Sequence, residues 1–128
     1  MLSPGAETAT SMAEKALVRL RKICLRFPEA TEKPFGNHVT FRVRDKNFAM
    51  YMDNHHGDGR VGLWCKAPLG AQDVLVNADP ERFFVPPYVG PKGWVGVHLD
   101  RRIDWKGVTQ LVADSYRLIA PKRLANSI

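Results

Sequence analysis

The sequence predicts an α+β domain, an antiparallel β-sheet with N- and C-terminal helices packed on one face. Three features predict it: an amphipathic helical pattern near each end, short alternating apolar runs between them, and short polar loops joining those runs. The expected element order is α-β-β-β-α-β-α. With 128 residues, 45% hydrophobic and 25% charged, the chain suits one core. We place it at residues 12–124, between a disordered tail (1–11) and a C-terminal tail (125–128).

The first helix is expected over residues 12–27, because Pro28 ends the helical pattern. At about 100° per residue, one face of this helix is basic and the apolar residues lie opposite. The basic face carries Lys15, Arg19, Lys22 and Arg26. We interpret this stripe as a solvent-exposed face.

A meander of three strands is expected after a structured loop over residues 28–37. Residues 38–44 alternate, with Val39, Phe41 and Val43 on one side, which indicates a half-buried strand. A turn at residues 45–47 leads to a second strand over 48–52, and the polar run 53–59 leads to a third over 60–66. Short loops between consecutive strands predict antiparallel pairing.

The second half of the chain predicts a short helix over residues 70–79, a helical piece over 80–84 and a fourth strand over 93–99. In that strand the alternation places Val95 and Val97 on the face opposite Trp94. Asp104 suits the N-cap of a long C-terminal helix with apolar residues at 3–4 spacing, and Pro121 ends this helix.

The segment over residues 80–97 sets four large aromatic side chains on a backbone rich in Pro and Gly: Phe83, Phe84, Tyr88 and Trp94. Pro fixes φ, and Gly allows conformations that other residues avoid, so a loop can aim these side chains. They either close the core or contact a partner. Core packing is favoured, because aromatic residues beside a strand usually pack.

Net charge favours a polyanionic partner and also fits plain solubility, since the chain carries a formal charge of +6 and a pI near 9.6. No apolar run approaches the ~20 residues that cross a membrane, and the N-terminal residues lack a signal-peptide pattern. We therefore expect a cytoplasmic protein without a membrane partner. Cys24 and Cys65 have no CxxC spacing, which predicts two buried thiols rather than a disulfide or a metal clip.

Residues that suggest catalysis each have a structural interpretation. His55 and His56 lie in an acidic, Gly-rich loop, but adjacent histidines rarely serve one metal, so we expect a solvated turn, with a pH-sensitive or phosphate contact as the alternative. Cys65 is expected in the core, and Ser115 as a helix-packing hydroxyl bonded to its own backbone. The sequence contains no Gly-rich phosphate loop. We expect no metal, no cofactor and no catalytic residue.

A basic surface interleaved with aromatic residues is the strongest functional signal. Outward cations of the meander and of the loop after it suit contacts with phosphates, and aromatic residues beside them suit stacking on a base. The expected phosphate contacts are Arg42, Arg44, Lys46, Arg60, Lys66 and Lys92. The expected stacking or pocket residues are Trp64, Tyr88 and Trp94. The alternative is that outward Arg and Lys only prevent edge pairing and maintain solubility.

Six short stretches follow one another in a recognisable order: residues 24–28 (CLRFP), 31–36 (TEKPFG), 41–43 (FRV), 64–66 (WCK), 87–90 with 93–95 (PYVG, GWV) and 114–116 (DSY). Their order and spacing resemble the YjbR/MmcQ family of small bacterial proteins. The resemblance covers residues 12–124 and implies a frataxin-like α+β fold. It also implies the family's label of DNA-binding protein with a double-wing shape. Among the positions that match the family pattern, only Lys66 suits a phosphate contact, together with nearby Lys92.

The expected function is DNA binding through the basic sheet face, with little sequence readout. The alternative is a small-molecule or protein-binding module that uses the aromatic loop over residues 83–94, without catalysis. Some relatives are called phosphoribosylglycinamide formyltransferase. We do not expect this activity, because the chain lacks a doubly wound nucleotide-binding half. A monomer or a weak homodimer is expected.

Overall fold

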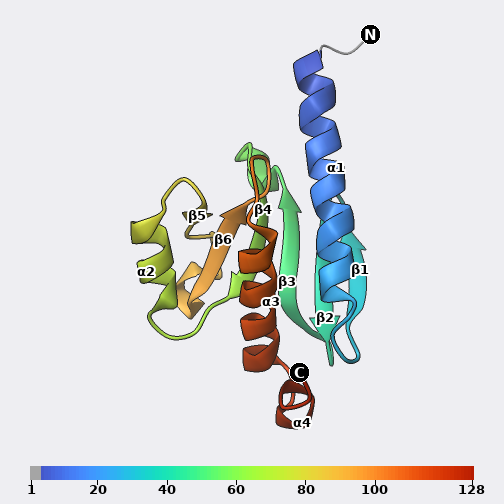
Figure 1. Cartoon of the computed structure of the whole chain (residues 1–128), viewed down its shortest axis with the longest axis vertical. Helices are drawn as coiled ribbons and strands as arrows, with labels where there is room; N and C mark the ends of the chain where they lie inside the picture. The colour runs from blue at the N-terminus through green and yellow to red at the C-terminus, as the bar shows by residue number, and fades with distance from the viewer. Residues whose placement is uncertain (1–3) are drawn as a thin grey trace.

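The computed structural model describes the backbone of residues 4–128 and the side chains of residues 12–128. Six antiparallel strands form one sheet in the spatial order β1-β2-β3-β4-β6-β5. The strands are β1 (Thr31–Phe35), β2 (His38–Val43), β3 (Lys46–Asp53), β4 (Val61–Lys66), β5 (Phe83–Phe84) and β6 (Trp94–His98). The helices are α1 (Pro4–Cys24), α2 (Ala71–Ala78), α3 (Trp105–Ile119) and α4 (Lys122–Ala125). Helices α1 and α3 cover the same face of the sheet (Figure 1), which confirms the α+β class.

Two strands that the sequence did not predict, β1 and β5, replace a loop and a helical piece that it did predict. Strand β1 lies within the predicted loop over residues 28–37, and its position at the edge of the sheet tolerates Pro34 because only one side of the strand is paired. Strand β5 replaces the helical piece predicted over residues 80–84. Phe83 joins the main core while Phe84 packs on the opposite face of the sheet, an alternation that a strand provides and a helix does not.

Helix α1 begins at Pro4 and ends at Cys24, whereas the sequence predicted residues 12–27. Residues 4–11 of the predicted disordered tail are therefore helical, and residues 1–3 lie outside the described part of the chain. At the other end, Leu124 of α4 is buried, and Ala125, the first residue of the predicted C-terminal tail, completes that helix. No helix among the described residues is both long enough and apolar enough to cross a membrane.

The main core lies between the inner face of the sheet and the helices α1 and α3. Leu20 of α1 and Val112 of α3 are fully buried there with Phe41 of β2. The pairing of β2 with β3 contains a bulge at Phe48. Phe41 pairs with Ala49 and Arg42 pairs with Asn47, so Phe48 has no partner residue in β2. Phe48 and Ala49 are both fully buried as a result.

Helix α3 is fixed at its start and at its middle by side-chain hydrogen bonds. As predicted, Asp104 is the N-cap, and its carboxylate accepts from the Gly107 amide at 3.1 Å. The Ser115 hydroxyl donates to the Phe48 carbonyl at 2.7 Å and accepts from the Lys66 amide at 2.9 Å. The prediction that Ser115 bonds to its own helix is therefore wrong. Its hydroxyl bridges β3 and β4 where their direct pairing has ended, one residue beyond the last paired residues.

A second apolar cluster lies on the outer face of the sheet, which α1 and α3 leave uncovered. Trp64, Phe84 and Trp94 are buried in it with Met52. The segment over residues 80–97 thus contributes mainly to packing, as favoured by the sequence. Its exception is Tyr88, which is 73% exposed.

Candidate nucleic-acid interface

The six cations predicted to contact phosphates fall into three separate places. Lys66 and Lys92 line one cleft of about 590 Å³ beside α2, with Asp73 as an acidic neighbour. Three others, Arg42, Arg44 and Lys46, lie at the turn between β2 and β3. Arg60 immediately precedes β4, at the end of that strand opposite Lys66. The structure therefore brings together only part of the predicted set.

Three of these cations are already engaged within the chain. The Arg44 guanidinium donates to both carboxylate oxygens of Glu29, at 2.6 and 3.0 Å, and these hydrogen bonds lower the pKa of Glu29. Arg42 donates to the Asp45 carbonyl at 2.6 Å. Arg60 lies 4.4 Å above the centre of the Phe84 ring. A phosphate would have to compete with these contacts.

Only one of the three predicted stacking residues presents its ring to solvent. Trp64 and Trp94 are 4% and 6% exposed, because both belong to the outer apolar cluster. The His55 ring also lies against Trp64, with centroids 5.1 Å apart. Tyr88 is the remaining candidate for stacking.

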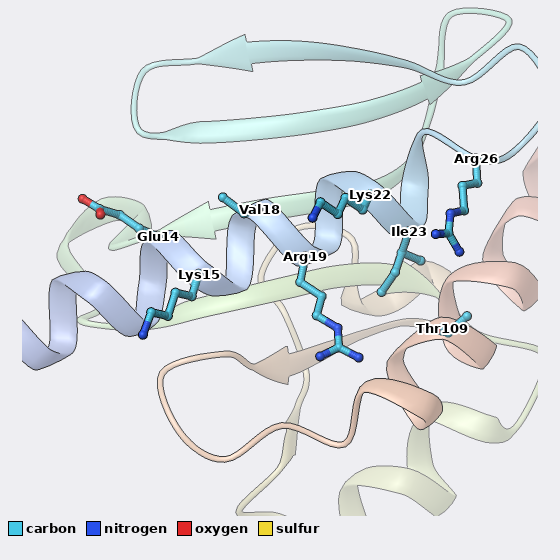
Figure 2. A pocket seen from close by; sticks show the side chains of 8 residues that line it. All are labelled: Glu14, Lys15, Val18, Arg19, Lys22, Ile23, Arg26 and Thr109. Atoms are coloured by element: carbon cyan, nitrogen blue, oxygen red, sulfur yellow. The ribbon is translucent and has the colours of Figure 1, made fainter.

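A groove beside α1 carries a denser set of cations than the sheet face. It has a volume of about 730 Å³, and its basic lining residues are Lys15, Arg19, Lys22 and Arg26. Figure 2 shows these side chains projecting from α1 and the residues that follow it, with Thr109 of α3 close to Ile23 and Arg26. The sequence identified this basic stripe but interpreted it only as a solvent-exposed face.

The fold of α1 explains why its cations share one groove. Ala16, Leu20 and Cys24 are buried against the sheet, so the residues between them on the opposite side of the helix face outward. From Lys15 to Lys22, the last of the three cations within α1, an α-helical rise of about 1.5 Å per residue gives a row of about 10 Å, and Arg26 follows two residues beyond the end of the helix. Of these four cations, Arg19 is also engaged within the chain, because its guanidinium lies 5.2 Å from the centre of the Trp105 ring in α3.

The charges of the groove are little compensated by neighbouring acids. Among residues 12–128, no ion pair involves any of the four cations of the groove. Among the described residues that line the groove, Glu14 is the one acidic residue. Arg21, on another side of α1, is instead paired with Glu32 of β1, with the closest atoms 2.7 Å apart. An uncompensated row of cations attracts a polyanion more strongly than cations held in ion pairs.

The two cysteines lie in the core and not at either surface. Burial raises the pKa of Cys65 to about 12 and raises that of Cys24 well above its ordinary value. Both thiols are therefore protonated at neutral pH, and their access to solvent is blocked.

We expect neither native thiol to react with iodoacetamide at pH 8, whereas both should react once the chain is unfolded in urea. Intact mass spectrometry before and after denaturation measures this directly. Rapid modification of Cys65 in the native protein would contradict its position in the core.

Comparisons with known proteins agree with the fold. A family model described as YjbR matches residues 25–118. Among solved structures, the crystal structure of the Deinococcus radiodurans protein DR2400, with the family-model domain DUF419, is similar: the TM-score is 0.64 and the identity 25%, over 77% of this chain and 74% of that chain. No curated protein matches the sequence. Because the family model covers more than half of the chain, from the residue after α1 through most of α3, the chain belongs to the YjbR family.

Proposed function

We propose that this protein binds DNA without catalysing a reaction, and that the groove beside α1 contacts the phosphate backbone. The observation that carries the proposal is a row of four exposed cations in one groove, Lys15, Arg19, Lys22 and Arg26, none of which forms an ion pair with another residue of the described range 12–128. Contacts of this kind position a protein on the duplex and carry little base readout.

DNA suits this groove because its charges are spaced regularly along a line, as are the cations. The three cations within α1 span about 10 Å by the helical rise, a length that covers about three successive phosphates along one strand of a duplex, and Arg26 lies just beyond the helix. The formal net charge of +6 adds a long-range attraction to the same partner. Four phosphate contacts predict a slope of about −3.6 for log K against log salt concentration, at −0.9 for each contact.

The sheet face is the rival DNA surface within the same proposal. Lys46, Lys66 and Lys92 remain available there, since no ion pair of the described residues involves them. However, Lys46 lies at the turn between β2 and β3, whereas Lys66 and Lys92 line the cleft that also contains Asp73. This separation, together with the negative charge of Asp73, makes the positive potential at any one place on this face weaker.

Two variants that each remove three positive charges distinguish the surfaces. The first is Lys15→Gln, Lys22→Gln, Arg26→Gln, and the second is Lys46→Gln, Lys66→Gln, Lys92→Gln. Fluorescence anisotropy with a labelled random duplex, at several salt concentrations, measures affinity and salt slope. We expect the groove variant to bind about tenfold more weakly or worse and its slope to become shallower by about 2.7, since three phosphate contacts are lost.

The second variant is the matched control, because both variants have the same net charge. It should retain most of the affinity and nearly the wild-type slope. Loss of binding in the control with retention in the groove variant would move the interface to the sheet face. If the wild type does not bind at low salt, DNA binding itself is refuted.

A further inference from the structure

A pocket on the outer face of the sheet is separate from the groove beside α1. It has a volume of about 310 Å³ and is lined mainly by aromatic rings and methionines. The residues that matter below are Phe35, His38, Met50, Met52, His55 and His56. Phe35, on the edge strand β1, is 71% exposed. Its ring is nearly parallel to that of His38, at 23° and 6.4 Å between centroids.

The ring of Tyr88 lies next to the histidine rings of this pocket, on the solvent side. Its ring lies 5.8 Å from that of His55 and 6.1 Å from that of His56, measured between centroids. Tyr88 has a φ of 66°, in the left-handed region that a bulky residue rarely adopts. Core packing does not account for this strain, because the side chain is 73% exposed. Strained residues of this kind are concentrated at sites that hold ligands.

The lining defines the chemistry that fits the pocket. None of its lining residues is an acid, a lysine or an arginine, and the methionine and aromatic surfaces favour a flat, uncharged ring. His38 supplies a polar group: its Nδ1 accepts from the Asp53 amide at 3.0 Å, which leaves Nε2 as the protonated nitrogen that donates. Partial burial, followed by the charges of His56 and His38, lowers the pKa of His55, so this ring is neutral at neutral pH.

We propose that this pocket binds a flat, neutral aromatic heterocycle with a hydrogen-bond acceptor, held between Phe35, His55 and Tyr88. The volume suits one such ring system at the lower end of the range for ligand pockets. The ring belongs either to a free small molecule or to an unpaired nucleobase in a strand, and the test separates these sources. The pocket is on the face opposite α1, so this inference does not depend on the proposed function.

Adenosine is a suitable free probe, with ribose as the control that lacks the ring. A short oligodeoxyadenylate strand and an abasic strand of equal length test the second source. Amide chemical shifts of Phe35, His38, Met52 and His55 in the wild type are the readout. Shifts with adenosine and not with ribose support a site for a free ring. Shifts with oligodeoxyadenylate and not with the abasic strand support a site for an unpaired base.

Tyr88→Gly and Tyr88→Phe separate ligand binding from folding. Glycine removes the ring and accepts the left-handed φ, so we expect affinity for the probe to fall about tenfold while the melting temperature stays level or rises by about 2 °C. Phenylalanine keeps the ring and should retain most of the affinity. The proposal fails if neither probe shifts these amides at millimolar concentration, if the abasic strand acts as strongly as oligodeoxyadenylate, or if Tyr88→Gly binds as well as the wild type.

Discussion

Ser115→Ala is expected to lower the free energy of unfolding by about 3 kcal/mol, because it removes the partner of two backbone groups, one of them buried and the other partly buried. The hydroxyl of Ser115 is fully buried and joins the Phe48 carbonyl of β3 to the Lys66 amide of β4. Direct β3–β4 pairing ends at Ala49 and Cys65, so neither group can recover a partner from the sheet without a shift of the strands. Urea denaturation followed by circular dichroism measures the change.

Thr109→Ala is the matched control for Ser115→Ala, since it removes a hydroxyl from the same helix. Thr109 is exposed, and its hydroxyl donates to the Trp105 carbonyl of its own helix, at 2.8 Å. Its removal should change the free energy of unfolding by less than about 0.5 kcal/mol. Equal effects of the two substitutions would mean that the bridge between β3 and β4 contributes nothing to stability.

Gly96→Ala is expected to lower the free energy of unfolding by about 3 kcal/mol, at the upper end of the usual effect of overpacking. A Cβ at position 96 would clash with two atoms of the Phe84 ring, well inside van der Waals contact. The ring cannot tilt away freely, because the Arg60 guanidinium lies 4.4 Å from its centre. Thermal and urea unfolding of the variant measure the loss.

The double variant Gly96→Ala, Phe84→Leu tests the cause of that loss. Leucine removes the outer ring atoms that the new Cβ would meet, so Gly96→Ala should be much less destabilising in this background than in the wild type. If the two substitutions are additive, the clash with Phe84 is not the reason why position 96 requires glycine.

The elements whose apolar residues recur at a regular spacing could be predicted from the sequence. Strand β2 alternates strictly between buried and half-buried residues, helix α3 has apolar residues at 3–4 spacing, and Asp104 marks the start of α3. Strand β1 could not be predicted, because most of its residues are exposed and its pairing partner, β2, defines it. Strand β5 has only two residues, which are too few to show an alternating pattern. It is a strand because it pairs with β6 in the folded chain.

The candidate sites depend on contacts that no local pattern contains. The basic stripe of α1 could be predicted, but the groove also requires Thr109, which is far away in the sequence and reaches it only in the folded chain. The family match begins at residue 25, after α1, so of the stripe it includes Arg26 but not Lys15, Arg19 or Lys22. Likewise, Trp64 was a reasonable stacking candidate until packing on the outer face of the sheet covered it.

The most direct test of DNA binding at the groove beside α1 is a titration of the isotope-labelled protein with a short duplex, followed by amide chemical shifts. We expect the largest changes at residues 15–26 of the chain and at Thr109, and only small changes at Lys46, Lys66 and Lys92. Changes centred on those three lysines, with residues 15–26 unaffected, would contradict the groove as the DNA interface.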